Sequence, residues 1–354
     1  MKPTAINLLA PLVFIIFQSC TTIPVINHPE RDTNSMPGEV SFCAAGDVML
    51  DRGVRKRIEE NGLGYIFEKT GGFIKTRNLS FCNLECPVSQ RGTRKNGGYA
   101  FRADPGFLEA VKTTGFNIVS VANNHMLDFG ADALRDTLSN LDNDNIAYAG
   151  AGINREEARK PRFVEVNGVK IALLADLDMP MIVAEVPGNT LAPQMSQRRG
   201  LLEMQKDIIE AKKQADVVLV SFHWGYEYTN YPLKDVTKLA KACVDAGADM
   251  VLGHHPHVMQ GIEVYKGKPI LYSMGNFVFD QFREMTSRTF VFSCEFLKNG
   301  TIRNAFITPV HIEKNRPVFA KGKLGDEIRS KLMEISRKFG TRFNLKDGRL
   351  YLQL

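Results

Sequence analysis

The chain has 354 residues, of which 44% are hydrophobic and 24% are charged, with a formal net charge of +6 at pH 7. This composition is ordinary for a globular protein with a hydrophobic core, and the length fits one large domain. The positive charges are scattered and form no basic stripe, so we expect no nucleic-acid partner.

The N-terminus has the outline of a bacterial export signal. An apolar stretch over 8–17 follows a positive residue and is too short to span a bilayer, which needs about twenty residues. Cys20 follows, as in a lipoprotein box whose thiol is acylated. Phe17 and Gln18 depart from the commonest box, so plain secretion or an uncleaved anchor remains the alternative. We expect a signal peptide over 1–20, lipidation of Cys20, and a membrane-anchored protein of the cell envelope that faces outside the cytoplasm.

The rest of the chain divides into three predicted parts. Residues 21–39 carry several Pro, Asn and Asp without apolar periodicity, which indicates a flexible tether. The folded domain is predicted over 40–315. A C-terminal helical extension and tail follows over 316–354.

Within the domain, short apolar runs alternate with helical patterns, which indicates an α/β fold. Strands are predicted at 40–45, 79–84, 117–122, 162–166, 169–175, 216–222, 249–252 and 269–273. Helices are predicted at 53–61, 105–114, 131–143, 200–214 and 232–247, with a last one at 325–339. Asn167 and Gly168 predict a hairpin turn between the fourth and fifth strands. Residues 289–297 and 301–311 predict a second hairpin on the same sheet system.

Polar residues follow several of these strands at once. Asp47, Glu85, Asn124, His125 and His223 each stand at or just beyond a predicted strand end. Loops at the ends of several strands are how an α/β scaffold assembles one site from distant parts of the sequence. Carboxylate oxygens suit hard cations, and neutral imidazole is the commonest metal ligand near neutral pH. The pattern therefore predicts a metal site.

A cluster of three histidines follows the apolar run 250–252. In Gly253-His254-His255-Pro256-His257, alternate side chains of an extended segment would share one side. We therefore expect His255 and His257 to face the metal site and His254 to point away.

Six motifs occur along the chain in a recognisable order. They are Gly46-Asp47-Val48-Met49-Leu50, Asn83-Leu84-Glu85, Ala122-Asn123-Asn124-His125, His223-Trp224-Gly225, the histidine cluster, and Ser273-Met274-Gly275-Asn276-Phe277. Over residues 40–312 this order resembles the CapA family of bacterial proteins linked to poly-γ-glutamate capsule synthesis. That family looks like a branch of the calcineurin-like metallophosphoesterases. The resemblance implies a four-layer α-β-β-α sandwich of two mixed sheets.

The resemblance also implies a ligand set for one or two divalent cations, with Mn or Zn favoured and Fe or Mg as alternatives. Asp47 and His257 would hold the first cation, Glu85 would bridge, and the second would be held by Asn124, His223 and His255. Four of these residues have a purely structural alternative. Asp47 could cap a helix, Glu85 could be solvated, Asn124 could form an Asx turn, and His223 could be a core histidine.

One position departs from the superfamily pattern. Phosphoesterases of that superfamily usually have Asp-x-His at the first motif, and this chain has Met49 at the His position. A thioether is not an ordinary ligand for a hard cation. The first metal position is thus one ligand short, and full dinuclear activity is in doubt.

Other residues are candidates for catalysis and substrate contact. His125 could protonate a leaving oxygen, and Asp128 could orient its ring. Arg52, Arg102 and Asn276 are candidates for substrate contact, because arginine binds carboxylate or phosphate through paired hydrogen bonds. Arg102 could equally belong to a surface ion pair. The five cysteines after Cys20 are expected to pack in the core, although a disulfide cannot be deduced or excluded from the sequence.

The expected function is that of an envelope-anchored CapA-like protein in capsule or poly-γ-glutamate biosynthesis or attachment. A metal-dependent, phosphoesterase-like hydrolase or transferase is favoured. The alternative is a non-catalytic anchoring or assembly factor that binds an anionic polymer through a degenerate fold. Implied partners are poly-γ-glutamate, capsule polysaccharide or a phosphate ester, the membrane through the lipid anchor, and a capsule synthase complex.

Overall fold

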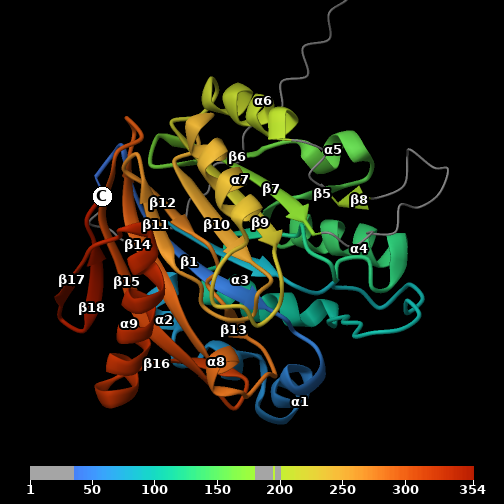
Figure 1. The fold of residues 1–354 in the computed structure, drawn as a ribbon. Coiled ribbons are helices and arrows are strands. Elements are labelled where there is room, and N and C mark those ends of the chain that lie inside the picture. The colour runs from blue at the N-terminus through green and yellow to red at the C-terminus, as the bar shows by residue number, and fades with distance from the viewer. Residues whose placement is uncertain (1–35, 180–193, 196–200) are drawn as a thin grey trace, which may run out of the picture.

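The computed structural model describes residues 36–179, 194–195 and 201–354 (Figure 1). The predicted signal peptide, Cys20 and most of the predicted tether lie outside this range. Among the described helices, none combines the length and the hydrophobicity needed to cross a bilayer.

Two mixed β-sheets form the centre of the molecule. The larger sheet has the strand order β17-β18-β15-β14-β1-β2-β3-β4, with β13 paired to β1 and β16 paired to β15. Its strands are β1 (Glu39–Val48), β2 (Leu79–Leu84), β3 (Ile118–Ser120), β4 (Ala147–Ala149), β13 (Asn276–Val278), β14 (Arg288–Leu297), β15 (Ile302–Glu313), β16 (Arg316–Phe319), β17 (Phe343–Lys346) and β18 (Arg349–Leu352).

The smaller sheet has the order β11-β12-β10-β9-β7-β6. Its strands are β6 (Arg162–Val166), β7 (Val169–Asp178), β9 (Val217–Trp224), β10 (Met250–His254), β11 (Ile262–Tyr265) and β12 (Lys268–Leu271). Two short strands, β5 (Ala151–Gly152) and β8 (Gln194–Met195), form a separate pair.

Helices cover the outer faces of both sheets (Figure 1). The helical segments are α1 (Arg52–Asn61), η1 (Leu63–Phe67), α2 (Gly71–Lys75), η2 (Pro105–Phe107), α3 (Leu108–Thr114), α4 (Gly130–Asn143), α5 (Arg155–Arg159), α6 (Leu201–Lys212), α7 (Lys234–Asp245), α8 (Glu284–Ser287), α9 (Gly322–Ser336) and η3 (Arg337–Phe339).

The period of two in the buried strands explains the layers. In β9, Leu219 belongs to the core between the two sheets, whereas its neighbour Val220 packs outward with residues of α6 and α7. In β1, Phe42 faces the smaller sheet and Cys43 packs with residues of α1, α3 and α4. Because both faces of these strands are buried, they are apolar throughout. The result is an α-β-β-α sandwich of two mixed sheets, as predicted.

The two predicted hairpins are confirmed. β6 and β7 pair antiparallel through Asn167 and Gly168, whose φ values of 50° and 77° are those that a two-residue hairpin turn requires. β14 and β15 also pair antiparallel. The helix predicted at 325–339 begins earlier, at Gly322.

The C-terminal segment differs from its prediction as an extension and tail. β16 pairs with β15, and the β17–β18 hairpin joins the larger sheet through β15. Its strands are only four residues long, so their signal is weak in the sequence. The segment after residue 315 completes the sheet.

Strand register brings the predicted site residues together. Asp47 at the end of β1 lies opposite Asn83 of β2 on one side and Asn276 of β13 on the other. In the smaller sheet, His254 of β10 lies opposite His223 of β9. Because these strands are parallel, their C-terminal ends form one edge.

Candidate metal centre

Two carboxylates form the buried base of the site. Asp47 and Glu85 are both fully buried, and the side-chain amide of Asn83 donates to each, at 2.9 Å to Asp47 Oδ1 and 3.1 Å to Glu85 Oε2. The second oxygen of each carboxylate, Asp47 Oδ2 and Glu85 Oε1, is buried without a hydrogen-bond partner. One amide therefore holds two acidic groups side by side and leaves one oxygen of each available.

Imidazole rings stand above these free oxygens. His257 Nε2 lies 3.6 Å from Glu85 Oε1, and His257 Nδ1 lies 3.6 Å from Asp47 Oδ2. His223 Nε2 lies 4.0 Å from the same Glu85 oxygen and 2.8 Å from Asn124 Oδ1. Ligand atoms of Asp47, Glu85 and His257 all lie within 4.8 Å of one another. The structure thus brings these predicted ligands to one centre.

His255 joins the cluster through the rings beside it. Its ring centroid lies 4.8 Å from that of His223 and 5.8 Å from that of His257. All six predicted metal ligands are therefore linked through short contacts, although Asn124 reaches the group only through His223.

Burial sets the protonation states at this site. It raises the pKa of Glu85 well above its usual value, and the neighbouring charge of Asp47 adds to this effect. Burial lowers the pKa of His223, and it lowers that of His255 to about 3, with nearby histidines contributing in both cases. Burial alone would raise the pKa of Asp47, but the hydrogen bond and charge of His254 bring it below its usual value. Both His223 and His255 are therefore neutral, which is the form that binds metal.

The prediction that His254 points away is wrong. Its Nδ1–H donates to Asp47 Oδ1 at 2.9 Å, and its Nε2 is buried without a partner. The expectation assumed one extended segment, but β10 ends at His254 and the next residues turn. His255 and His257 have φ values of 95° and 57°, which are rare for residues other than glycine. The turn brings His255 and His257 to the same centre that His254 faces from the strand.

Met49 supplies no ligand. It is fully buried in the core on the helix side of the larger sheet, and its sulfur accepts a hydrogen bond of 3.1 Å from the backbone N–H of Asp51. The position that the superfamily gives to a histidine is here part of the hydrophobic core.

His125 and Asp128 are in direct contact. The His125 Nδ1–H donates to Asp128 Oδ2 at 2.7 Å, and the backbone N–H of Phe101 donates to the same oxygen at 2.8 Å. Lys95 forms an ion pair with the other oxygen of Asp128. The Phe101 ring lies against His125 with centroids 4.1 Å apart. Burial lowers the pKa of His125, and the Asp128 hydrogen bond partly offsets this. These contacts fix the ring and leave Nε2 as its free nitrogen.

The two candidate arginines differ in how their side chains are used. Arg52 Nε pairs with Asp280 Oδ2 at 3.0 Å, and its guanidinium lies over the rings of Tyr99 and Phe101. Arg102 donates to the backbone oxygen of Arg91 at 3.0 Å and lies over the Phe129 ring, 4.2 Å from its centroid. Of the two arginines, Arg52 therefore lies nearer to His125 through packing, because the Phe101 ring contacts both side chains.

Asn276 does not fit its predicted role in substrate contact. It is fully buried, its Oδ1 accepts from His257 Nδ1 at 2.8 Å, and its amide nitrogen donates to Thr286 O and Gln281 Oε1. These partners occupy both ends of the amide. Asn276 instead orients a histidine of the metal centre.

Three further residues belong to the site but were not predicted. Asn83 bridges the carboxylates, and Asn123 donates to Asn83 Oδ1 at 3.2 Å. Glu227 lies in a loop after β9, with a ligand atom within 4.8 Å of ligand atoms of His255 and His257. The period of two in Asn83-Leu84-Glu85 could have indicated Asn83. Glu227 stands four residues after His223 in a loop, where no periodicity indicates direction.

The donor set fits a divalent cation. Four buried ligand atoms lack hydrogen-bond partners, namely Asp47 Oδ2, Glu85 Oε1, His254 Nε2 and His255 Nδ1. Each such atom costs about 1–3 kcal/mol when it stays unsatisfied. A cation satisfies carboxylate oxygens and neutral imidazole nitrogens together. The residues present therefore match the metal that the fold implies.

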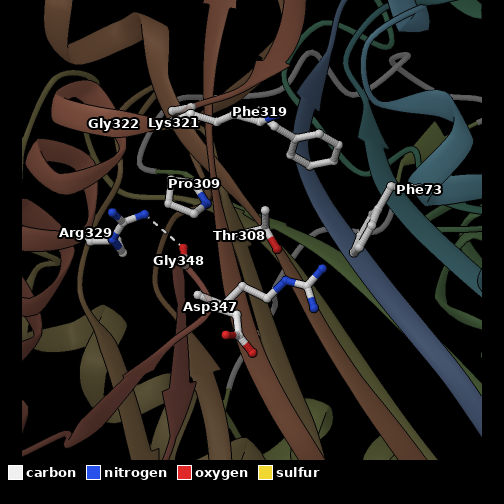
Figure 2. Close-up of a pocket in the computed structure, with 11 residues that line it drawn as sticks. Phe73, Thr308, Pro309, Phe319, Lys321, Gly322, Arg329, Asp347 and Gly348 are labelled. Carbon is white, nitrogen blue, oxygen red and sulfur yellow. Dashed lines mark hydrogen bonds between the residues drawn. The ribbon is translucent and has the colours of Figure 1, made fainter.

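A separate pocket of about 330 Å³ lies between α2, β15, β16, α9 and β18 (Figure 2). Phe73 and Phe319 form one wall, and Arg329, which donates to Gly348 O at 2.8 Å, forms the other. The residues that line it include none of the metal centre.

The five described cysteines are all buried, as expected for core packing. Burial raises the pKa of Cys86 to about 12 and that of Cys82 well above its usual value. Neither thiol is therefore ionised near neutral pH.

Residues 41–281 match the family described as bacterial capsule synthesis protein PGA_cap. The chain belongs to this family. It is 33% identical to the PGA biosynthesis protein CapA of Bacillus subtilis (strain 168), over 96% of this chain and 89% of that protein. It is 30% identical to the capsule biosynthesis protein CapA of Bacillus anthracis, over 100% of this chain and 87% of that protein. The chain is also 26% identical to a probable polyglutamine synthesis accessory protein of Mycobacterium tuberculosis (strain CDC 1551 / Oshkosh). That match covers 86% of this chain and 93% of that protein.

Proposed function

We propose that this chain acts in the biosynthesis or attachment of poly-γ-glutamate or another anionic capsule polymer, as a metal-dependent hydrolase or transferase. The names of its relatives support the biological role. The observation that carries the chemistry is the buried cluster in which free oxygens of Asp47 and Glu85 face the ring of His257. A protein that only binds a polymer has no use for so many buried, unsatisfied polar atoms.

The proposed ligands are those predicted from the sequence: Asp47, Glu85, Asn124, His223, His255 and His257. They would hold one or two divalent cations, with Mn or Zn favoured. A bound cation lowers the pKa of water toward neutrality and polarises a phosphoryl or carbonyl oxygen. Asn83 and His254 keep Asp47 oriented for this role, and Asn276 does the same for His257.

His125 is the proposed proton donor to the leaving group. Asp128 accepts from its Nδ1–H, so Nε2 is the nitrogen that gives the proton, and it does so when the ring is protonated on both nitrogens. Phe101 covers one face of the ring and excludes water from that side. Arg52 is the proposed anion contact, because its guanidinium lies over Phe101 and its side chain is 36% exposed.

The proposed substrate is an anionic polymer or a phosphate ester. The polymer would be poly-γ-glutamate or a capsule polysaccharide. We also propose that lipidation of Cys20 anchors the protein in the cell envelope, with the domain outside the cytoplasm. The proposed protein partner is a capsule synthase complex.

Met49 favours one alternative function. Because its sulfur is committed to the Asp51 backbone, the site lacks a ligand that related phosphoesterases have. The alternative is an anchoring or assembly factor that holds an anionic polymer on a degenerate metal fold and does no chemistry.

Metal content and turnover separate the two functions. The full-length chain, purified without chelator, is analysed for Mn, Zn and Fe and then assayed on a generic phosphodiester and on poly-γ-glutamate. Bound metal with hydrolysis of either substrate supports the enzyme. If the protein binds no metal when metal is supplied in a stoichiometric amount, the enzymatic function is contradicted. Binding of the polymer without turnover favours the assembly factor.

A further inference from the structure

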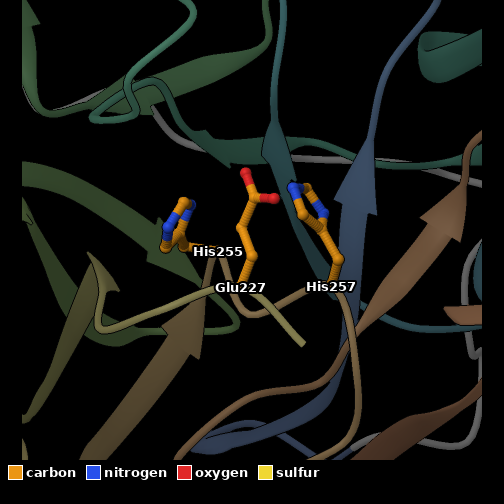
Figure 3. Close-up of side chains that lie close together, drawn as sticks. All are labelled: Glu227, His255 and His257. Carbon is orange, nitrogen blue, oxygen red and sulfur yellow. The ribbon is translucent and has the colours of Figure 1, made fainter. Parts of the chain in front are cut away.

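Glu227 faces two histidines of the metal centre from a separate loop. Figure 3 shows its side chain between His255 and His257. One ligand atom from each of the three residues lies within 4.8 Å of the others. This group is distinct from the buried group of Asp47, Glu85 and His257, and it shares only His257 with it.

Backbone and side-chain bonds fix the two loops together. The N–H of Tyr228 donates to Pro256 O at 2.8 Å, directly beside Glu227 and between the two histidines. Farther along, the Gln260 side chain donates to Thr229 O at 2.8 Å. Tyr228 also has a positive φ of 60°, which costs energy that the surrounding contacts must offset. Glu227 is therefore held next to the histidines by the fold.

The two histidines have nitrogens available for a ligand. His255 is 3% exposed, and its buried Nδ1 has no hydrogen-bond partner. His257 uses Nδ1 on Asn276, which leaves Nε2 as the free nitrogen. Metal-binding histidines commonly show this pattern, with one nitrogen fixed by a carbonyl and the other free.

We propose that Glu227 is a metal ligand that acts with His255 and His257; the one free nitrogen of His257 then serves this cation, and Asp47 and Glu85 hold the other. The inference rests on the proposed function, because it adds a residue to the same metal centre. Glu227 is exposed whereas Asp47 and Glu85 are fully buried, so its cation lies on the solvent side of the centre.

Charge and ligand type support this assignment. Asp47 and Glu85 together balance the charge of one divalent cation, and Glu227 adds a third carboxylate on the side of a second cation. The carboxylate oxygen and the imidazole nitrogens form a set that suits Mn or Zn.

The test is metal binding by three versions of the full-length chain. Wild type, Glu227→Gln and the control Glu59→Gln are stripped of metal and titrated with Mn²⁺, with free Mn²⁺ followed by electron paramagnetic resonance. Glu59 is an exposed residue of α1 outside both ligand groups, and its substitution removes the same charge. Thermal melting in chelator checks that all three are folded.

We expect Glu227→Gln to lose one cation per chain or to bind it at least about tenfold more weakly, with Glu59→Gln unchanged. Equal stoichiometry and affinity in wild type and Glu227→Gln would overturn the assignment and leave the proposed metal centre in place. No Mn²⁺ binding by wild type in this titration, together with no bound Zn²⁺ by elemental analysis, would overturn both. An equal loss in Glu59→Gln would show a general charge effect and also overturn the assignment.

Discussion

The Nδ1–H of His257 donates to the side-chain oxygen of Asn276 across 2.8 Å, in a position where both residues are buried. The orientation of the amide is fixed, because its nitrogen donates to Thr286 O. Asn276 therefore keeps the proton on Nδ1 and the lone pair of His257 on Nε2, the atom that lies 3.6 Å from Glu85 Oε1. A buried amide thus determines which nitrogen of His257 can bind metal.

Asn276→Ala should weaken metal binding about 10–100-fold, because loss of such an orienting partner frees the ring and its tautomer. The measurement is Mn²⁺ or Zn²⁺ affinity by titration. Gln281→Ala is the matched control, since it removes another partner of Asn276 and spares the bond to His257. Equal affinity in Asn276→Ala and wild type would show that the bond does not control the ligand.

His125→Ala should keep its metal and lose about 10²–10⁴-fold in turnover, because general-acid catalysis contributes by that factor. His223→Ala should lose metal and turnover together, since His223 lies within 4.0 Å of Glu85 Oε1. Elemental analysis beside phosphodiester and poly-γ-glutamate hydrolysis distinguishes the two. Loss of metal in His125→Ala would make it a ligand and contradict its assigned role.

The metal-free protein should lose stability as the pH falls below 6.5. Folding lowers the pKa of His223 and brings that of His255 from 6.5 to about 3, so the unfolded chain binds more protons below pH 6.5 and stability falls as pH falls. Folding raises the pKa of Glu85 above 4.5, so the unfolded chain binds fewer protons there and stability falls as pH rises. Below pH 6.5 two histidines act against one carboxyl, so the free energy of unfolding falls as pH falls.

Urea unfolding at pH 5, 6.5 and 8 in chelator measures this dependence. Saturating Mn²⁺ should add stability, because a cation binds the ionised carboxylates and neutral imidazoles of the folded chain. Metal-free stability that is no lower at pH 5 than at pH 6.5 would contradict the burial of neutral His223 and His255.

Gly46→Ala should destabilise the protein by about 1–3 kcal/mol or more and weaken metal binding. A Cβ at this position would lie 1.9 Å from Gly275 O, the same oxygen that accepts from the Asp47 backbone N–H at 3.0 Å. Gly72→Ala is the control, because nothing lies within 4 Å of its added Cβ. Urea unfolding of both variants is the measurement, and equal stability would show that β1 can move away from residue 275.

Cys20→Ala should release the domain from the membrane into the soluble periplasmic or medium fraction. The physical reason is that two or more acyl chains at one cysteine anchor stably, at about 0.8 kcal/mol per buried CH₂. Fractionation of cells with an antibody to the folded domain measures the release. Unmodified wild-type chain in the cytosol would contradict the anchor.

The sequence by itself determined the strand ends and the residue types that stand there. Apolar runs that stop at Asp47, Glu85 and His223 locate ligands, because a buried strand has no place for such groups except where it leaves the sheet. The hairpin at Asn167 and Gly168 was also predictable from the sequence, because a two-residue turn depends on local backbone angles.

Only the tertiary structure decided which way the side chains near those ends point. His255 and His257 turn toward the centre that His254 faces from β10, because positive φ values at both positions break the alternation that the sequence suggests. The position of Glu227 likewise depends on a bond between Tyr228 and Pro256, 28 residues apart in the chain. Such long-range contacts leave no periodic pattern in the sequence, and they determine the geometry of the metal centre.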